Sequence, residues 1–149
     1  MTIAIANDHA GAKVKKVIIK FLKDEGHSVL NFGTDTEESV DYPDFTSKAA
    51  ESVQKNYADF GIVICGTGIG ASITANKFKG VHAALCHDEF TAKMARNHNN
   101  ANVIAIGARV LSEKEIVKLI DIFLKEPFLG DRHARRVNKI KDIEDKNFC

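Results

Sequence analysis

Short apolar runs alternate along the chain with longer stretches in which apolar residues recur at helical spacing. The short runs predict strands over residues 2–6, 28–32, 60–65, 81–86 and 102–107. The longer stretches predict helices near residues 14–22, 43–56, 69–78 and 88–97, with two more in the C-terminal third. Strands that alternate with helices are typical of an α/β domain built on a parallel sheet.

Two of the helices carry clear signals at their ends. The first is followed by Gly26 as a stop, and its apolar stripe at i, i+3, i+4 spacing consists of Val14, Val17, Ile18, Phe21 and Leu22. The other begins behind a capping box of Ser112 and Glu115, and Pro127 prevents its continuation. We expect the first of these amphipathic helices to cover the sheet.

The last segment combines dense charge with a narrow apolar seam at Val137, Ile140 and Ile143. We predict a helix over about residues 130–146. A helix with so little apolar surface usually leans on a partner, and the alternative is a solvated terminal helix on its own domain. We favour a helix that packs on a partner subunit.

Length and charge exclude several classes of protein. The 149 residues suffice for a single domain, 1–149, and 21 basic against 20 acidic residues leave almost no net charge. The chain therefore lacks the overall field expected of a nucleic-acid-binding or membrane-surface protein. The first eight residues contain no basic leader, and no run approaches the ~18 apolar residues of a membrane span. We expect a cytoplasmic protein.

Three cysteines, Cys65, Cys86 and Cys149, are widely separated and show no C-x-x-C spacing. This pattern argues against both a disulfide framework and a structural zinc site. We assign Cys86 to the core and expect Cys149 to be exposed and without a role.

Cys65 stands where the apolar strand 60–65 meets a glycine-rich turn at Gly66, Gly68 and Gly70. Glycines let the backbone turn tightly with its N–H groups exposed, and such a turn binds anions. A thiol beside those groups is favoured as thiolate, so Cys65 is a candidate base or nucleophile next to an oxyanion site. An isolated cysteine is more often a small buried apolar residue.

Other polar residues follow or flank the strands, where ligands bind to open parallel sheets. Asp8 can be a simple helix cap, but His9 beside it makes a role with sugar hydroxyls or protons competitive. His98 lies in an asparagine-rich loop and acts as an acid or base only if folding brings it to the thiol. A cationic cluster contains Arg132, His133, Arg135 and Arg136. The spacing of Arg132 and Arg136 suits a phosphate, but a run of charged residues is more often a solvated face of a helix.

A nucleotide-binding module is the competing interpretation from another class. Gly66, Gly68 and Ala71 match G-x-G-x-x-G/A after a strand, and Asp88 follows at about the distance expected for the ribose-binding acid. The motif falls on the third strand, however, and leaves the thiol unexplained.

Five motifs together resemble the type B ribose-5-phosphate isomerases, in the sugar-phosphate isomerase family that includes galactose-6-phosphate isomerase subunits. The motifs run nearly end to end: Asp8-His9, the D-Y-P of Asp41, Tyr42 and Pro43, the I-C-G-T-G-I-G turn, the H-N of His98 and Asn99, and R-H-x-x-R from Arg132. The resemblance implies a Rossmann-like, three-layer α/β/α fold with a five-stranded parallel sheet. It also implies a homodimer, sometimes paired into tetramers, whose active sites draw on both subunits.

The resemblance further implies isomerisation of a phosphorylated sugar without metal or cofactor. Cys65 would move a proton between C2 and C1, and His98 would assist ring opening. The expected binding residues are Asp8, His9 and Asn99 for hydroxyls, Gly66, Thr67, Gly68, Ile69 and Gly70 for the enediolate oxygens, Arg132 and Arg136 with His9 for the phosphate, and Tyr42 and Arg109 in the same set. Some members use a nearby glutamate as the base, but residues 71–76 contain no carboxylate.

The preferred sugar stays open at this stage. Five- and six-carbon phosphates differ by one hydroxymethylene unit, which is a matter of pocket depth. We expect interconversion of ribose 5-phosphate and ribulose 5-phosphate, with allose or galactose 6-phosphate as the alternative substrates.

Overall fold

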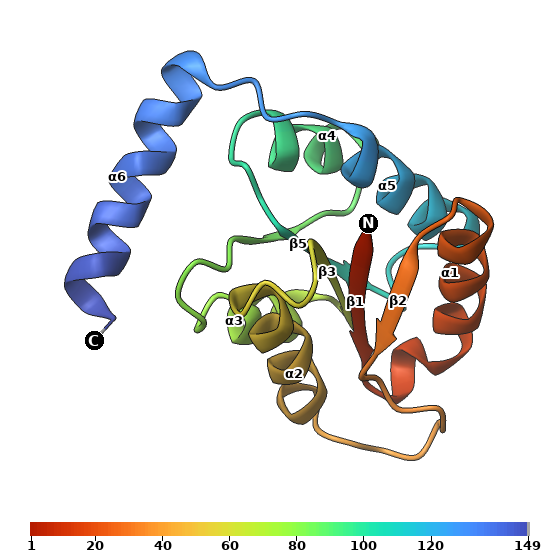
Figure 1. The fold of residues 1–149 in the computed structure, drawn as a ribbon. Coiled ribbons are helices and arrows are strands. Elements are labelled where there is room, and N and C mark those ends of the chain that lie inside the picture. Colours follow the sequence, from red (N-terminus) through yellow and green to blue (C-terminus); the bar gives the residue numbers. More distant parts are fainter. Residues whose placement is uncertain (149) are drawn as a thin grey trace.

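Five parallel strands form one sheet in the order β2-β1-β3-β5-β4. The computed structural model describes residues 1–148. The strands are β1 (Thr2–Asn7), β2 (Ser28–Asn31), β3 (Phe60–Cys65), β4 (Ala83–Leu85) and β5 (Val103–Gly107). Helices cover both faces of this sheet, which confirms the predicted three-layer α/β fold (Figure 1).

The helices divide between the two faces. One face is covered by α1 (Ala12–Asp24), α4 (Glu89–Asn97) and α5 (Glu113–Lys125), and the other by α2 (Tyr42–Gln54) and α3 (Ile69–Ala75). A short 3₁₀ turn, η1 (His9–Gly11), precedes α1, and α6 (Asp131–Asn147) lies to one side of the three layers (Figure 1). In the part of the chain that is described, no helix is both long and apolar enough to cross a membrane.

The two faces of the sheet carry side chains of different size. The face toward α1 and α5 is built from large residues: Ile3, Ile5, Ile62, Ile64, Ile104 and Ile106. The face toward α2 and α3 is built mostly from small ones: Ala4, Ala6, Val63, Cys65, Val103 and Ala105. Because side chains alternate along a strand, this division follows from the order of residues in each strand. The small face lets the Ala-rich helices α2 and α3 approach closely and places Cys65 beneath α3.

Side-chain hydrogen bonds of Asn76 explain why α3 is shorter than predicted. Its Nδ2 donates to the carbonyl groups of Ser72 and Ala83 (3.0 and 2.9 Å), and its Oδ1 accepts from the Ala83 N–H (2.9 Å). An asparagine that binds nearby backbone groups offers an alternative to the helix, so α3 ends at Ala75.

α6 is attached to the domain along part of its length. Val137 is buried, whereas Ile140 and Ile143 are exposed. Near its C-terminal end, Glu144 accepts a hydrogen bond from the Gly80 N–H (2.8 Å). The predicted helix is thus confirmed, and two of the three residues of its apolar seam lie uncovered within the single chain.

The capping box of α5 generates a first prediction. The Ser112 hydroxyl donates to Glu115 Oε2 (2.7 Å) and accepts from the Glu115 N–H (3.3 Å). Ser112→Ala removes the cap, and we expect it to lower the free energy of unfolding by about 1 kcal/mol, or Tm by about 2–4 °C.

Thermal unfolding at one protein concentration measures this loss, with Ser39→Ala as the control. Ser39 is an exposed loop residue, so we expect that substitution to change stability by less than about 0.5 kcal/mol. Equal effects of the two substitutions would contradict the capping role.

Candidate active site

The sheet order reverses between β1 and β3, and Asp8 and Cys65 meet at this point. From β1 the chain runs to β2 on one side, and from β3 it runs to β4 and β5 on the other. Asn7 pairs with Ile64, and the Asp8 N–H donates to the Ile64 carbonyl (3.1 Å). The residues that follow, Asp8 and Cys65, therefore end adjacent strands at the switch point, where open α/β sheets bind their ligands.

The Cys65 thiol faces the backbone of the glycine turn. Its Sγ accepts a hydrogen bond from the Gly68 N–H (3.2 Å), and the side chain is buried. Gly68 has φ +80°, in the left-handed region that favours glycine, and a Cβ there would lie 2.8 Å from the Ile106 carbonyl carbon. The turn thus holds a sulfur and backbone donors together, as the sequence predicted.

Tyr42 and Arg109 close over the glycine turn because the glycines carry no side chains. A Cβ on Gly70 would lie 2.3 Å from the Tyr42 ring, and one on Gly66 would lie 3.1 Å from Arg109 Nη1. The Arg109 N–H also donates to the Gly66 carbonyl (3.0 Å). An aromatic ring and a guanidinium therefore flank the turn that carries the thiol.

The acid and the imidazole at the end of β1 are both held by backbone groups. Asp8 Oδ1 caps η1 by accepting from the Ala10 N–H (2.9 Å), so its capping role is confirmed. His9 Nδ1 accepts from the Val40 N–H (3.2 Å), just ahead of Tyr42. These contacts gather Asp8, His9 and Tyr42 with the turn at the carboxyl edge of the sheet.

The predicted site residues near the end of α4 and on α6 lie at the opposite edge of the sheet, where the strands begin. α4 starts beyond the carboxyl end of β4 and runs back to the amino end of β5, so His98 and Asn99 follow it there. α6 begins near the same place, because the Leu129 N–H donates to the Asn97 carbonyl (3.1 Å). One chain therefore does not bring His98, Asn99, Arg132 or Arg136 to Cys65.

His133 has a role that sequence analysis missed. Its ring stacks on His98, with the ring centroids 4.0 Å apart and the planes 10° from parallel. Burial, and then the neighbouring His98, Arg132 and Arg136, lower the pKa of His133. His133 thus packs as a buried ring rather than joining the cationic cluster, and the only signal in the sequence was its place between two arginines.

The arginines beside it stay available for an anion. Arg132, Arg135 and Arg136 are exposed, and none has a carboxylate within ion-pair distance in residues 1–148. Guanidinium groups spaced one helical turn apart suit the oxygens of a phosphate.

Cys86 is a core residue, as predicted. It is buried, and burial followed by the charge of Asp88 raises the pKa of its thiol to about 12. A thiol so rarely ionised near neutral pH does not act as a base. Cys149 lies outside the described residues.

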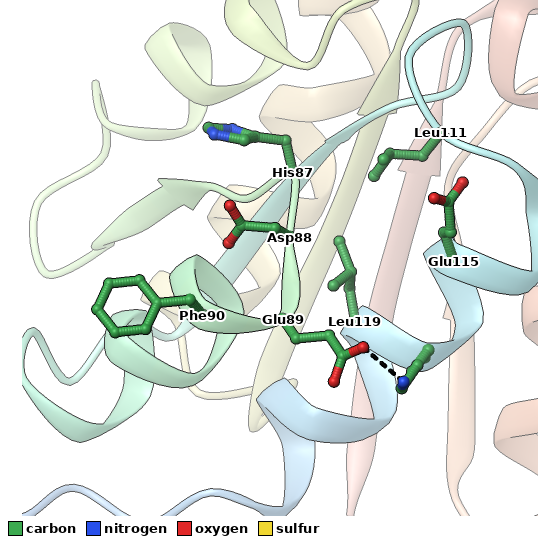
Figure 2. Close-up of a pocket in the computed structure, with 8 residues that line it drawn as sticks. His87, Asp88, Glu89, Phe90, Leu111, Glu115 and Leu119 are labelled. Atoms are coloured by element: carbon green, nitrogen blue, oxygen red, sulfur yellow. Dashed lines mark ion pairs between the residues drawn. The ribbon is translucent and has the colours of Figure 1, made fainter.

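A hollow of about 340 Å³ lies between α4 and α5, and Cys65 is not among the residues that line it. Figure 2 shows the side chains around this hollow. Carboxylates of Asp88, Glu89 and Glu115 line it, and Lys118 is paired with Glu89 (2.5 Å). Hydrogen bonds from Thr91 lower the pKa of Asp88, and hydrogen bonds from Ser112 lower that of Glu115. This negative lining disfavours a phosphate. A smaller hollow of about 210 Å³ borders Thr67 and Gly107.

The nucleotide-binding interpretation fails on the sheet order. β4 pairs with β5 and not with β3, so Asp88 does not follow a strand that neighbours the one before the glycine turn, as the fingerprint requires. Asp88 instead caps α4, where its carboxylate accepts from the Thr91 N–H (2.7 Å). The acid is therefore not placed to bind the ribose of a nucleotide on that turn. Within residues 1–148, no cluster of three or more His, Cys, Asp and Glu side chains is placed to hold a metal ion.

The fold and the thiol-bearing turn define an α/β domain with a candidate catalytic cysteine at the carboxyl edge of a parallel sheet. A family model described as Ribose/Galactose Isomerase matches residues 3–140. Ribose-5-phosphate isomerase B of Escherichia coli is 40% identical over 144 residues, which are 97% of this chain and 97% of the relative. The chain belongs to this family of isomerases.

Solved structures agree with that assignment. Ribose-5-phosphate isomerase B of Clostridium thermocellum superposes with a TM-score of 0.96 at 50% identity, over 98% of this chain and 99% of that one. The Mycoplasma genitalium enzyme, solved with bound ribulose-5-phosphate, superposes with a TM-score of 0.94 at 44% identity, over 98% of this chain and 97% of that one.

The contact between Gly70 and Tyr42 generates a second prediction. Gly70→Ala places a methyl group inside the Tyr42 ring position, so we expect the ring to swing out of the site. The chain has two tyrosines and no tryptophan, so tyrosine fluorescence in a Tyr57→Phe background reports Tyr42 alone. We expect a changed spectrum and greater quenching by acrylamide.

Ser72→Ala, a substitution on the same helix, is the control and should leave the Tyr42 spectrum as in the parent. An unchanged spectrum in folded Gly70→Ala would show that the ring does not depend on the missing side chain.

Proposed function

We propose that this protein interconverts D-ribose 5-phosphate and D-ribulose 5-phosphate through an enediolate, with Cys65 as the base. The observation that carries the proposal is the Cys65 sulfur set against the Gly68 N–H at the switch point of the sheet. Family membership supports it, as does the Mycoplasma genitalium structure with ribulose-5-phosphate. The proposal places the protein in the cytoplasm and in the pentose phosphate pathway.

The chemistry needs one base that reaches two adjacent carbons and donors for the charge on oxygen. In the aldose-to-ketose direction, the Cys65 thiolate takes the C2 proton, and the electron pair moves toward O1 to form the enediolate. The backbone N–H groups of residues 66–70 stabilise the charge. The thiol then returns the proton to C1, and the proton on O2 passes to O1, so that the C2 carbonyl and the C1 hydroxyl form. No net oxidant or metal enters the balance.

Binding groups surround this centre in the proposed complex. Asp8, His9 and Asn99 bind sugar hydroxyls, while Tyr42 and Arg109 flank the turn. Arg132 and Arg136 bind the phosphate together with His9, and His98 assists ring opening.

We further propose that the site is completed by a second copy of the chain in a homodimer, which can pair into a tetramer. His98 and the two arginines lie at the opposite sheet edge from Cys65, so one chain does not bring all of the groups together. The exposed Ile140 and Ile143 on α6 offer apolar surface for the partner subunit.

Kinetics of wild type and Cys65→Ala test the function. We expect wild type to convert ribose 5-phosphate in the presence of EDTA and to prefer it over allose and galactose 6-phosphates. Cys65→Ala should lower kcat by about 10²–10⁴ with a smaller change in KM, because a base acts in the transition state.

Cys86→Ala is the matched control, since it removes a buried thiol that has no proposed role and should retain kcat. A folded Cys65→Ala enzyme with wild-type kcat would assign the proton transfer to another group. A preference for a six-carbon phosphate would move the proposal to the alternative substrates.

Mixing two inactive variants tests the shared site. Each shared site takes Cys65 from one chain and Arg136 from the other. A heterodimer of one Cys65→Ala chain and one Arg136→Ala chain therefore has one site with both residues intact and one site that lacks both. After denaturation and refolding of an equal mixture, we expect about a quarter of wild-type activity, because half of the dimers are mixed. Refolded single variants are the controls. If the refolded mixture is no more active than the average of the two refolded single variants, each site uses only one chain.

A further inference from the structure

Lys15 is a buried lysine that the proposed chemistry does not use. It lies on α1, and its side chain is 1% exposed. Its ammonium group has three N–H donors, and three oxygen atoms accept from it: the Gly33 carbonyl (3.1 Å), the Thr34 carbonyl (2.7 Å) and Asp35 Oδ1 (2.6 Å). A fully buried lysine is rare unless it is paired, so this complete set of partners indicates a defined task.

The partners of Lys15 all lie in the loop after β2, at the carboxyl edge of the sheet. The Thr34 carbonyl also accepts from Asn7 Nδ2 (3.0 Å), and the Thr34 N–H donates to the Asn7 carbonyl (3.2 Å). Gly33 lies so close to Asn7 that a Cβ there would be 1.8 Å from Asn7 Oδ1. The loop is therefore pressed against the end of β1, directly before Asp8.

The same loop reaches the imidazole of the candidate site. Residues 33–35 are held by Lys15, and a few residues later the Val40 N–H donates to His9 Nδ1 (3.2 Å). A backbone N–H can only donate, so Nδ1 must be the acceptor, and a neutral His9 carries its proton on Nε2. The loop then enters α2, whose first residue is Tyr42.

We propose that Lys15 is a positioning residue: by clamping the loop after β2, it keeps Val40 against His9 and so maintains the imidazole with Nε2–H as its free donor. The consequence for substrate binding rests on the proposed function. There, the Nε2–H group of His9 donates to a hydroxyl or phosphate oxygen of the sugar.

The charge on Lys15 also affects Asp35, an acidic residue of the same loop. Its ammonium group, by hydrogen bond and by charge, lowers the pKa of the Asp35 carboxyl. Lys13, on the same helix, makes an ion pair with Glu37 in the same loop (3.1 Å), but both side chains are largely exposed. Exposed pairs contribute little, because water and salt screen them. Lys15 is thus a buried clamp on the loop, whereas Lys13 makes only a surface contact with it.

Lys15→Met tests the proposal, since methionine keeps most of the length and removes the donors. Without them, the loop carbonyls lose their buried partner and the loop shifts. Nitrogen-15 NMR of the His9 ring, assigned with His9→Gln, reports which ring nitrogen carries the proton. In wild type we expect the proton on Nε2, and in Lys15→Met a mixture of both tautomers.

Kinetics provide the second measurement. We expect KM for ribose 5-phosphate to rise about tenfold or more in Lys15→Met with a smaller change in kcat. The reason is that the hydrogen bond from Val40 to His9 is lost, and His9 then no longer orients the bound sugar. Lys13→Met is the matched control and should keep the tautomer and KM of wild type. Asp35→Asn removes the negative charge of the exposed partner and should shift both readouts in the same direction by less, and it carries the test if Lys15→Met does not fold.

A folded Lys15→Met protein with wild-type tautomer and KM overturns the proposal. Wild-type protein that isomerises no sugar phosphate contradicts the proposed function instead, and the NMR comparison still decides the role of Lys15.

Discussion

The parallel register of β1 against β3 is the constraint on which the candidate site depends. Pairing of Asn7 with Ile64 makes Asp8 and Cys65 the next residues on adjacent strands. Pairing of Cys65 with Gly107 then brings the turn after β3 against the end of β5, where a side chain on Gly107 would collide with the Thr67 carbonyl. A slip of one residue would turn Cys65 from the small face of the sheet to the large one and remove the thiol from the turn.

Close packing on the small face of the sheet explains how the site is assembled. Small side chains under α2 and α3 let the two helices approach each other, and the missing side chain at Gly70 admits the Tyr42 ring. The loop before α2 carries Val40 to His9 and is held from below by Lys15. The candidate site is thus supported by Lys15 and by the small residues under α2 and α3, and such surrounding contacts give a loop a defined geometry.

The path of α4 divides the predicted residues between two edges of the sheet. A helix that connects parallel strands must return to the amino edge, so any residue after it lies far from the carboxyl ends. His98 therefore stands with α6, stacked on His133, while Cys65 stands at the other edge. This separation supports the proposal of a site shared by two subunits, with exposed arginines on α6 facing outward.

Local signals in the sequence determined the elements of this protein and the residues at their ends. The apolar runs, the capping box at Ser112 and the glycine turn after Cys65 each act over a few residues, so they could be predicted, as could the family. Only the tertiary structure decided that β4 pairs with β5 and not with β3, so that Asp88 does not follow a neighbour of β3, and that Lys15 and His133 are buried. Strand order and burial depend on contacts between residues far apart in the chain, and no local pattern records them.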